Sequence, residues 1–447
     1  MIKNFVIDTN ILLHSPNAIT NGFADNHVII TGTTLQELDR KKTFSGEIGY
    51  NARRSIRILD ELRKTGDLTK GVPTNSGGQL SVVAKGIGQA FLPDGFDLSV
   101  PDNRILSTCL FLNSEMDKKV ILITNDISMR VNASILGIAV EEYKNDKIQP
   151  VYLNASDCVH SAMINEIYEK GFVESDKAYY PNQFVTLCTD NEFNKKSALT
   201  VYQDGCLKLI SKQKTFGHIK PLNAMQTYAI WALRQPAEVI PLVILIGPAG
   251  TAKTLLSLAV GMEFTYTGSN EAKYSKVLLS RPNGIGFSNI GFLPGDLDQK
   301  LSPLMASYYD NMEVILGFED EDREQIRIQM EDILETGVVE LCSLDFIRGR
   351  SLQNTYIICD EAQNASKGLI RDVVTRAGRG SKVVLAGDPE QIDVPSLDKY
   401  NNGLVFAAST MMDSQYSAII TFDNSQSVRS ELAKEAIRRM TFKDTDV

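Results

Sequence analysis

The sequence predicts an α/β protein of two domains, each built on a parallel sheet, with a small β-rich connector between them. Two observations support this fold class. Short apolar runs alternate with helical stretches over residues 1–145 and again over residues 216–447, which is typical of parallel sheets covered by helices. Residues 146–215 instead carry short apolar runs separated by polar turns. The 447-residue chain is long enough for two or more hydrophobic cores.

The first domain is expected over residues 1–145. The expected strands cover residues 5–7, 27–31 and 120–123, and the expected helices cover residues 35–41, 52–64 and 103–112. Parallel strands need a crossover connection between them, which is usually a helix. The order of these segments therefore predicts one parallel sheet with helices on both faces.

The connector and the second domain differ in their patterns. In the connector, residues 146–215, strands are expected at residues 184–188, 198–202 and 206–210. The second domain, residues 216–447, returns to the alternation of strands and helices, with strands expected at residues 242–246, 277–280, 356–359 and 383–386. This alternation predicts a second parallel sheet.

Composition restricts the partners of the chain. The formal net charge is −9, so a nucleic acid would have to be held by a local basic surface and not by overall attraction. The longest apolar run, residues 239–246, is interrupted by Pro241 and is shorter than the ~20 residues of a membrane span, which predicts a buried strand and no membrane partner. No signal peptide is evident, and the six cysteines form no C-x-x-C pair. We therefore expect a cytoplasmic protein with reduced thiols.

A glycine-containing turn follows the expected strand 242–246 and leads into the helical stretch 255–261. This context is typical of a P-loop, in which backbone amides and the helix N-terminus cradle the phosphates of ATP. The lysine of such a loop contacts the β- and γ-phosphates, and the residue after it holds Mg²⁺. The loop consists of Gly247, Pro248, Ala249, Gly250, Thr251, Ala252, Lys253 and Thr254.

Position 252 departs from the P-loop pattern, because alanine stands where G-x-x-x-x-G-K-[ST] has glycine. If the loop requires a positive φ at this residue, alanine costs roughly 1 kcal/mol. The sequence therefore predicts a loop that is weakened but still able to bind nucleotide.

Two adjacent carboxylates, Asp360 and Glu361, directly follow the expected strand 356–359. Such a pair at the carboxyl end of a strand is typical of a Walker B element. We expect Asp360 to bind Mg²⁺ through water and Glu361 to polarise the attacking water. Together with the P-loop, the pair predicts ATP hydrolysis.

Three further residues are candidates for the nucleotide site. Gln391, after the expected strand 383–386, is a candidate sensor of the γ-phosphate, with a plain Gly-Asp turn as the alternative explanation of its segment. Gln226 precedes a helical stretch and is a candidate for reading the adenine edge. Arg429 is a candidate finger for the charge of the transition state, within the chain or across a subunit boundary, with a solvated surface arginine as the alternative.

Four carboxylates of the first domain are expected at one edge of its sheet, namely Asp8, Glu37, Asp102 and Asp126. Asp8 directly follows one apolar strand and Asp126 comes soon after another, and the carboxyl ends of parallel strands meet at the same edge. Oxygen ligands suit Mg²⁺ or Mn²⁺, and one or two such ions would activate water for attack on a phosphodiester. The alternative is structural, with Asp102 as a helix cap and Glu37 as a surface acid.

A basic helical stretch, residues 51–64, lies between these acids in the sequence. Its basic residues are Arg53, Arg54 and Arg57, and its apolar residues are Ile56, Leu59 and Leu62. A basic face beside an acidic site would guide a phosphate backbone toward the metals. A solvated charged face is the alternative.

The two halves together resemble the PIN-PhoH family, whose members join a PIN nuclease domain to a PhoH-type ATPase. The resemblance covers nearly the whole chain. It rests on motifs at residues 6–14, 35–39, 101–106 and 124–126 in the first half, and on the P-loop and motifs at residues 290–296, 347–351, 360–364, 387–393 and 429–433 in the second. The departure of Ala252 from the pattern is the one that bears on nucleotide affinity.

The resemblance implies ATP-dependent RNA unwinding combined with metal-dependent RNA cleavage, with DNA as an alternative substrate. It implies PIN acids at the four carboxylates, ATPase residues as assigned above, and a ring-like homo-oligomer, expected to be a hexamer. The cofactors are ATP and Mg²⁺ or Mn²⁺. A second hypothesis is an ATP-gated RNA-binding or toxin-like regulator in which one of the two sites is idle.

Overall fold

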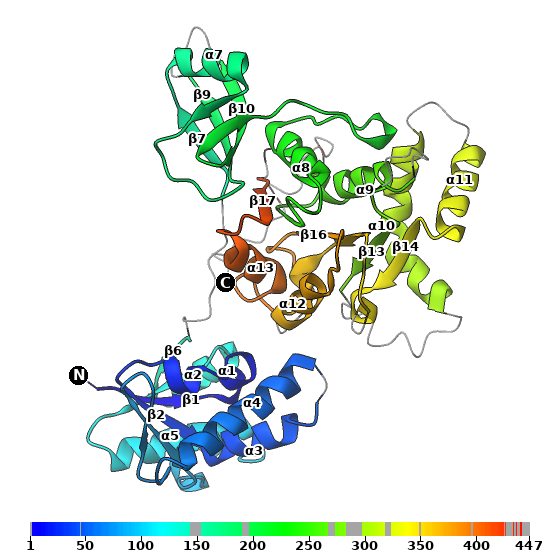
Figure 1. Ribbon diagram of the computed structural model, residues 1–447. Helices are drawn as coiled ribbons and strands as arrows, with labels where there is room; N and C mark the ends of the chain where they lie inside the picture. The colour runs from blue at the N-terminus through cyan, green and yellow to red at the C-terminus, as the bar shows by residue number, and fades with distance from the viewer. Residues whose placement is uncertain are drawn as a thin grey trace. The chain divides into compact units, whose positions relative to one another are not determined.

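The computed structural model describes residues 2–44, 46–143, 153–189, 196–266, 273–282, 297–317, 323–347, 350–394 and 397–423, together with residues 425, 432, 435 and 439. The chain divides into two compact units, Met1–Lys147 and Ile148–Val447 (Figure 1). Within the part of the chain that is described, no helix combines the length and the apolar character needed to cross a membrane.

The first unit is built on a six-stranded sheet with the strand order β3-β4-β2-β1-β5-β6. Every neighbouring pair is parallel except β3 with β4. The strands are β1 (Asn4–Ile7), β2 (His27–Thr31), β3 (Val72–Pro73), β4 (Gln79–Val83), β5 (Val120–Ile123) and β6 (Ala139–Glu141). The helices are α1 (Thr9–His14), α2 (Ala18–Asn21), α3 (Gly32–Lys41), α4 (Gly46–Arg63), α5 (Pro101–Glu115) and α6 (Ile127–Ile135).

The sheet of the first unit is covered on both faces, as the sequence predicts. Alternate residues of a strand point to opposite faces. Accordingly, Phe5 and Ile7 of β1 pack into one hydrophobic cluster with residues of α1, α3 and α4, whereas Val6 packs into another with residues of α5 and α6. Ile7 pairs with Ile30 on one side and with Ile123 on the other. The chain segments that follow β1 and β5 therefore leave the sheet at the same edge.

The second unit begins with a five-stranded sheet in the order β7-β9-β10-β11-β8, antiparallel except for the pair β7 and β9. Its strands are β7 (Ala155–Cys158), β8 (Phe172–Glu174), β9 (Phe184–Cys188), β10 (Ser197–Gln203) and β11 (Cys206–Leu209). It also contains a helix that the sequence analysis did not predict, α7 (Ser161–Lys170), with Ile164 and Ile167 buried and Gly171 in the left-handed conformation at its end. That spacing and that terminal glycine are helix signals within an otherwise β-rich segment.

This small sheet packs against the rest of the second unit. Phe184 of β9 stacks on Tyr228, with ring centroids 4.8 Å apart, and the Asn182 amide donates to the carbonyl oxygens of Gln415 and Ser417 at 2.9 and 3.0 Å. Buried aromatic stacking and satisfied buried amides both stabilise such contacts. The connector therefore belongs structurally to the ATPase half of the chain.

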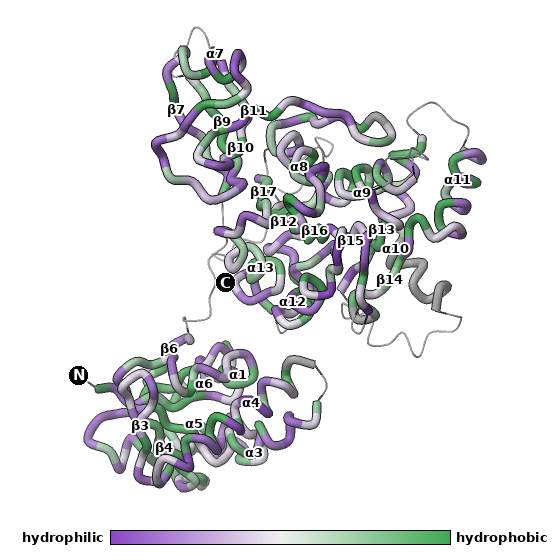
Figure 2. Tube along the Cα trace, in the orientation of Figure 1, coloured by the Kyte–Doolittle hydropathy of each residue, from purple (hydrophilic) through white to green (hydrophobic). Residues whose placement is uncertain are grey.

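The remainder of the second unit is a fully parallel six-stranded sheet in the order β14-β13-β15-β16-β12-β17. The strands are β12 (Leu242–Ile246), β13 (Lys276–Arg281), β14 (Val339–Ser343), β15 (Thr355–Cys359), β16 (Lys382–Gly387) and β17 (Ser417–Thr421). The helices are α8 (Ala224–Arg234), α9 (Lys253–Glu263), α10 (Leu297–Leu316), α11 (Arg323–Glu335), α12 (Lys367–Arg376) and α13 (Gly403–Met411). Strands β12 and β15 are buried along their whole length, and β12 is also hydrophobic throughout (Figure 2), as expected for strands covered on both faces.

Candidate active sites

The nucleotide site lies at the carboxyl edge of the parallel sheet in the second unit. Strands β15, β16 and β12 are neighbours in that sheet, and Ile246 at the end of β12 pairs with Gly387 at the end of β16. The P-loop, the Walker B acids and the Gly387–Asp388 segment each follow one of these strands. Ligands of open parallel sheets bind at this edge.

The P-loop requires left-handed backbone conformations at several positions. Gly250 has φ 82°, and Ala252 has φ 69° and ψ 22° directly before helix α9. The structure therefore confirms that position 252 needs a positive φ, which is the condition under which alanine is unfavourable. At Gly247 a side chain would not fit, because a Cβ atom there would lie 2.7 Å from Phe422 Cβ.

The side chains of Lys253 and Thr254 form hydrogen bonds within the site, Lys253 to the P-loop and Thr254 to the Walker B segment. The Lys253 ammonium donates to the carbonyl oxygens of Gly247 at 2.7 Å and Pro248 at 2.9 Å. The Thr254 hydroxyl donates to Asp360 Oδ1 at 3.0 Å. Burial, and next the neighbouring charge of Glu361, raises the pKa of Asp360 to about 6. A bound cation would offset this unfavourable burial of negative charge, which fits the expected Mg²⁺ ligands.

Glu361 is held at both of its carboxylate oxygens by residues that the sequence analysis did not single out. Arg281, at the end of β13, donates to Oε1 at 3.1 Å, and the buried Gln363 donates to Oε2 at 2.6 Å. Glu361 itself has a left-handed backbone, with φ 52° and ψ 38°, a strained conformation of the kind that occurs at functional sites. Its carboxylate is thus fixed in direction. The positions of Arg281 after an apolar strand and of Gln363 just beyond the acid pair were the available sequence signals.

Gln363 also connects the Walker B segment to the loop after β16. Its side-chain oxygen accepts from the Asp388 amide at 3.1 Å, and its amide nitrogen donates to the Gln391 carbonyl oxygen at 2.8 Å. The Gln391 side chain in turn donates to Asp388 Oδ2 at 2.8 Å. Gln391 therefore belongs to a hydrogen-bonded network that reaches Glu361.

These segments enclose a cavity of about 360 Å³, which is within the usual range of ligand sites. Its lining residues are Ala249, Gly250, Ala252, Lys253, Thr254, Leu255, Ser307, Asn311, Asp360, Glu361, Gly387, Asp388 and Gln391. Most of the predicted P-loop residues and both Walker B acids are among them. The cavity combines a cation, carboxylates and a helix N-terminus, the chemistry that a nucleoside triphosphate with Mg²⁺ requires.

Two candidates for the nucleotide site are not among the residues that line the cavity. Gln226 is buried, its side-chain oxygen accepts from the Leu222 amide at 2.8 Å, and its nitrogen lies 3.4 Å from the Thr251 carbonyl oxygen. It braces the P-loop, and its reading of adenine stays a prediction. Arg429 lies outside the described residues, as does the motif at residues 290–296.

The second site is the group of carboxylates in the first unit. Asp8 is buried, with 2% of its surface exposed, and its Oδ2 accepts from the Thr124 hydroxyl at 2.7 Å. Glu37 accepts from the Thr9 hydroxyl at 2.6 Å, so it is not simply a surface acid. Each of these acids is thus held by a threonine beside another member of the group, a signal that the sequence analysis did not use.

Asp102 and Asp126 occupy the starts of two helices. Asp126 is the N-cap of α6, accepting from the Met129 amide at 2.9 Å. Asp102 makes no cap hydrogen bond, because Val100 is the N-cap of α5 and Pro101 is its first residue. The capping alternative considered for Asp102 is therefore wrong, and its carboxylate is left for another role.

The carboxylates of the first unit are close enough to influence one another. Burial, then the nearby charges of Asp102 and Glu37, raises the pKa of Asp8 to about 6 despite the Thr124 hydrogen bond. Burial, Glu37 and Asp126 likewise raise the pKa of Asp102. Clustered acids with raised pKa values are unfavourable without a compensating cation and typical of functional sites.

The four carboxylates are not arranged as a complete coordination site for a metal ion. Among the residues that the structure describes, no three His, Cys, Asp or Glu side chains are close enough together to hold a metal ion. The contacts of Glu37 with Thr9 and of Asp126 with Met129 explain the spacing, since each carboxylate is turned toward a local donor. The donor types suit a hard divalent cation.

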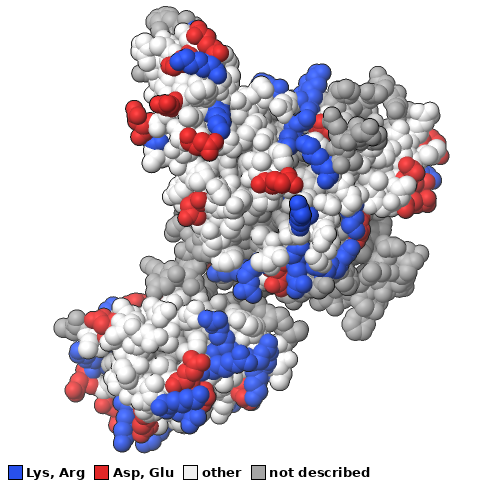
Figure 3. Space-filling view, in the orientation of Figure 1, with Lys and Arg blue, Asp and Glu red and all other residues white. Residues whose placement is uncertain are grey.

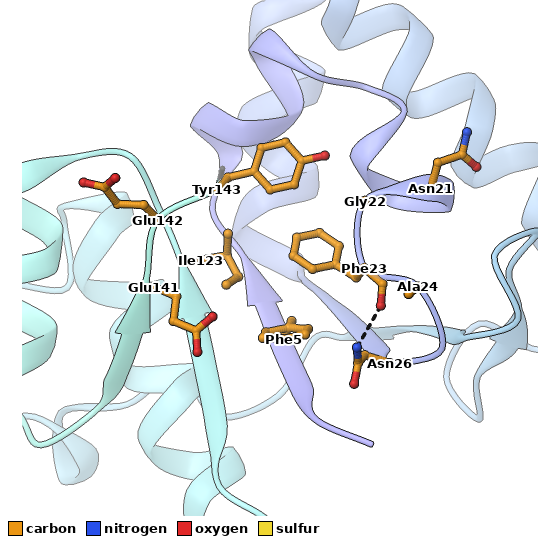
Figure 4. Close-up of a pocket in the computed structure, with 10 residues that line it drawn as sticks. All are labelled: Phe5, Asn21, Gly22, Phe23, Ala24, Asn26, Ile123, Glu141, Glu142 and Tyr143. Atoms are coloured by element: carbon orange, nitrogen blue, oxygen red, sulfur yellow. Dashed lines mark hydrogen bonds between the residues drawn. The ribbon is translucent and has the colours of Figure 1, made fainter. Parts of the chain in front are cut away.

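A pocket in the first unit has none of the four carboxylates in its lining. This pocket of about 670 Å³ is walled by Phe5, Phe23 and Tyr143, whose rings are in contact, and none of the four carboxylates lines it (Figure 4). The acids on its rim are engaged, Glu141 with Lys3 and Glu142 with Arg130. The four carboxylates are therefore the candidate site in this unit because of their chemistry, and not because they line this pocket.

Comparisons with known proteins identify a family for each half of the chain. Residues 5–144 match the family described as PIN domain, and residues 218–441 match the PhoH family, described as PhoH-like protein. The Protein PhoH2 of Bacillus subtilis (strain 168) is 36% identical over 91% of this chain and 93% of its own. The Protein PhoH2 of Thermobispora bispora is 29% identical over 93% of this chain and 94% of its own.

Another relative matches a smaller part of this chain. It is the PhoH-like protein of Bacillus subtilis (strain 168), 34% identical over 43% of this chain and 56% of its own length. The two PhoH2 relatives, by contrast, are matched over nearly the whole of both chains. With a PIN domain before a PhoH-like P-loop ATPase domain, this chain belongs to the PIN-PhoH family.

Proposed function

We propose that the chain couples ATP hydrolysis in the PhoH-like domain to unwinding of RNA and metal-dependent cleavage of RNA in the PIN domain. One observation carries the proposal. The chain holds a cavity lined by the P-loop and the Walker B acids in one domain, and four carboxylates that influence one another in the other. Neither constellation is needed for folding, because each concentrates buried charge at a sheet edge.

In the ATPase domain, Lys253 would exchange its bonds to the loop carbonyls for bonds to phosphate oxygens, and Thr254 and Asp360 would hold Mg²⁺. Glu361 would accept a proton from the attacking water, in a direction set by Arg281 and Gln363. Gln391 would respond to the γ-phosphate through the network that reaches Glu361. Arg429 is proposed as the finger residue.

In the PIN domain, Asp8, Glu37, Asp102 and Asp126 would hold one or two Mg²⁺ or Mn²⁺ ions. When bound, such an ion activates water and stabilises the leaving oxygen of a phosphodiester. The chain's own contribution is to keep the acids together at an energetic cost that appears as the raised pKa values of Asp8 and Asp102. Because the reaction consumes ATP, we expect it in the cytoplasm, carried out by a ring-like hexamer.

The test is degradation of a labelled RNA with a duplex and a single-stranded tail, in Mg²⁺ or Mn²⁺, with ATP, a non-hydrolysable analogue or no nucleotide. Cleavage that proceeds through the duplex only with hydrolysable ATP supports coupling. Asp8→Asn should abolish cleavage but not ATP hydrolysis, and Lys253→Ala the reverse. Loss of both activities in either variant contradicts a division of labour between the domains.

A second candidate function is an ATP-gated RNA-binding or toxin-like regulator with one idle site. The observation that favours it is the left-handed backbone of Ala252, which weakens the P-loop. Nucleotide-dependent RNA binding without turnover would support this alternative. ATP hydrolysis that is stimulated by RNA would contradict it.

A further inference from the structure

Exposed basic and aromatic side chains gather where helices α3 and α4 meet in the first unit. Figure 3 shows Lys and Arg side chains clustered over this part of the unit. We define the α3–α4 surface as Lys42, Phe44, Tyr50, Arg53, Arg54 and Arg57, all of them exposed. Phe44 and Tyr50 have 54% and 51% of their surface exposed. Large aromatic residues so exposed on a charged surface are candidates for contact with a partner.

The backbone brings the two aromatic residues and the arginines together. A Cβ atom at Gly49 would lie 1.8 Å from the Phe44 carbonyl oxygen, so only glycine lets the turn fold onto the start of α4. Arg53 Nη1 donates to the Lys42 carbonyl oxygen at 2.5 Å. The turn is thereby tied to the helix, and Phe44 is kept beside the basic residues.

The arginines of this surface are not used in ion pairs with the described acids. The described salt bridges of α3 and α4 join Lys42 to Asp39, and Asp60 to Arg63 and Lys64. They leave Arg53, Arg54 and Arg57 outside. Arg54 instead donates to the Asn17 side chain at 3.2 Å. A row of guanidinium groups without carboxylate partners is suited to binding phosphates.

The surface continues into the acidic site. Lys41, at the end of α3, lies one turn beyond Glu37 on the same side of the helix. Helix α3 packs against α5, which carries Asp102, and against α4, which carries the arginines. The basic residues at the end of α3 therefore adjoin the carboxylates that we propose as the nuclease site.

We propose that the α3–α4 surface binds single-stranded nucleic acid, with its arginines on phosphates and Phe44 and Tyr50 stacked on bases, and delivers the strand to the four carboxylates. This inference rests on the proposed nuclease function. Base stacking on aromatic side chains requires unpaired bases, since a duplex hides their faces. The surface therefore selects the tail of an unwound substrate, whether RNA or DNA.

The experiment uses the full chain in EDTA, so that the strand is bound but not cut. A short single-stranded RNA containing 4-thiouridine is photocrosslinked, and the crosslinked peptide is identified by mass spectrometry. The expected peptide contains Phe44 or Tyr50. Phe44→Ala with Tyr50→Ala should reduce crosslinking at this site about tenfold or more. A DNA of the same length containing 4-thiothymidine shows whether the surface distinguishes the sugars.

Charge is tested with Arg53→Gln, Arg54→Gln and Arg57→Gln combined. The affinity for a single strand falls with salt, and each phosphate contact contributes about −0.7 to the slope of log affinity against log salt concentration. Loss of three contacts should therefore make the slope less steep by about 2. The matched control is Arg63→Gln with Lys64→Gln, which removes basic residues from the same helix where they pair with Asp60. This control should leave both slope and crosslink unchanged.

Two results separate this inference from the proposed function. If the chain cleaves RNA but both surface variants keep the wild-type KM and no crosslink maps to residues 42–57, the surface is not a binding site, although the nuclease stands. If the crosslink is present but no RNA is cleaved with Mg²⁺ or Mn²⁺, the surface stands and the nuclease proposal fails. Equal crosslinking of fully duplex RNA, or no crosslink to either nucleic acid, overturns the inference.

Discussion

The buried amide of Gln363 donates a 2.6 Å hydrogen bond to the Glu361 carboxylate, and the oxygen of the same side chain accepts from the Asp388 amide at 3.1 Å. One side chain thus joins the Walker B acid to the loop after β16, where Gln391 lines the nucleotide cavity. The side chain of the neighbouring Asn364 forms a similar bridge, donating to Asp393 Oδ2 at 3.2 Å and accepting from the Asp393 amide at 2.8 Å. Asn364 contacts Glu361 through its backbone amide, which donates to the Glu361 carbonyl oxygen and not to the carboxylate. The pair provides a test of positioning with its own control.

Gln363→Ala should lower kcat for ATP hydrolysis by about 10- to 100-fold, because Glu361 loses the bond that directs it at water. The KM for ATP should change little, since the contacts of Lys253 and Thr254 remain. Steady-state ATPase assays at matched folded fractions measure both constants. Asn364→Ala removes a bridge between the same two segments and should leave kcat near the wild-type value; an equal loss in both variants would mean that the bridges act only on stability.

Ala252→Gly should improve nucleotide binding. Glycine adopts the φ of 69° found at this position without the steric penalty of a Cβ atom, a gain of roughly 1 kcal/mol. The expected result is an ATP affinity raised by about fivefold, measured by calorimetry or with a fluorescent nucleotide. Ala249→Gly, in the same loop, is the control. Tighter binding in the control alone would show that strain at residue 252 does not limit the loop.

Asp8→Asn should stabilise the first unit at neutral pH while abolishing cleavage. The folded-state pKa of Asp8, about 6, lies above its ordinary value of 3.8, so the folded state binds more protons and loses stability as pH rises from about 3.8 through 6. Asparagine carries no charge and can still accept from Thr124. At pH 7.5 in EDTA the gain is roughly 1–3 kcal/mol, seen as a higher unfolding temperature in calorimetry, and it should shrink at pH 4.5.

The same variant tests metal binding without any activity assay. Mg²⁺ or Mn²⁺ should raise the unfolding temperature of the wild-type first unit at pH 7.5, because a ligand that binds only the folded state stabilises it. Asp8→Asn should abolish most of this increase. An equal increase in both proteins would mean that the cations bind elsewhere.

Lys382→Met should destabilise the ATPase unit. The ammonium is buried at the start of β16 and donates to the carbonyl oxygens of Ala232, Gln235 and Ile240 at 2.8–2.9 Å. Burial lowers its pKa to about 7, whereas the three acceptors favour the charged form. Leaving them unsatisfied should cost about 2–4 kcal/mol, measured by denaturant unfolding. Lys367→Met is the control, because Lys367 is a partly exposed lysine at the start of α12. A similar loss of stability in this control would contradict the role of the Lys382 ammonium in binding the three carbonyl oxygens.

The long-range organisation was predictable because it depends on repeated local patterns. Runs such as residues 242–246 and 356–359 are apolar throughout and end in a glycine or an acid, which marks buried parallel strands and their functional edge. The helix α7 was missed, because two buried isoleucines and a terminal glycine are a weak signal among β-forming neighbours. The two-residue strand β3 and the three-residue strand β6, at the margins of the first sheet, carry too little pattern to be recognised.

Within the sites, sequence determined which chemical groups are present, and tertiary structure decided which of them touch. The P-loop, the acid pair and the four carboxylates were recognisable from residue type and position after apolar strands, including the strain expected at Ala252. The sequence did not reveal three sets of hydrogen bonds. Arg281 and Gln363 donate to the Glu361 carboxylate. Thr9 donates to Glu37 and Thr124 to Asp8, and Gln226 donates to the P-loop carbonyl oxygen of Thr251. Such contacts join residues far apart in the chain, or depend on the direction of single side chains. Only the packing of the strands and helices determines those directions.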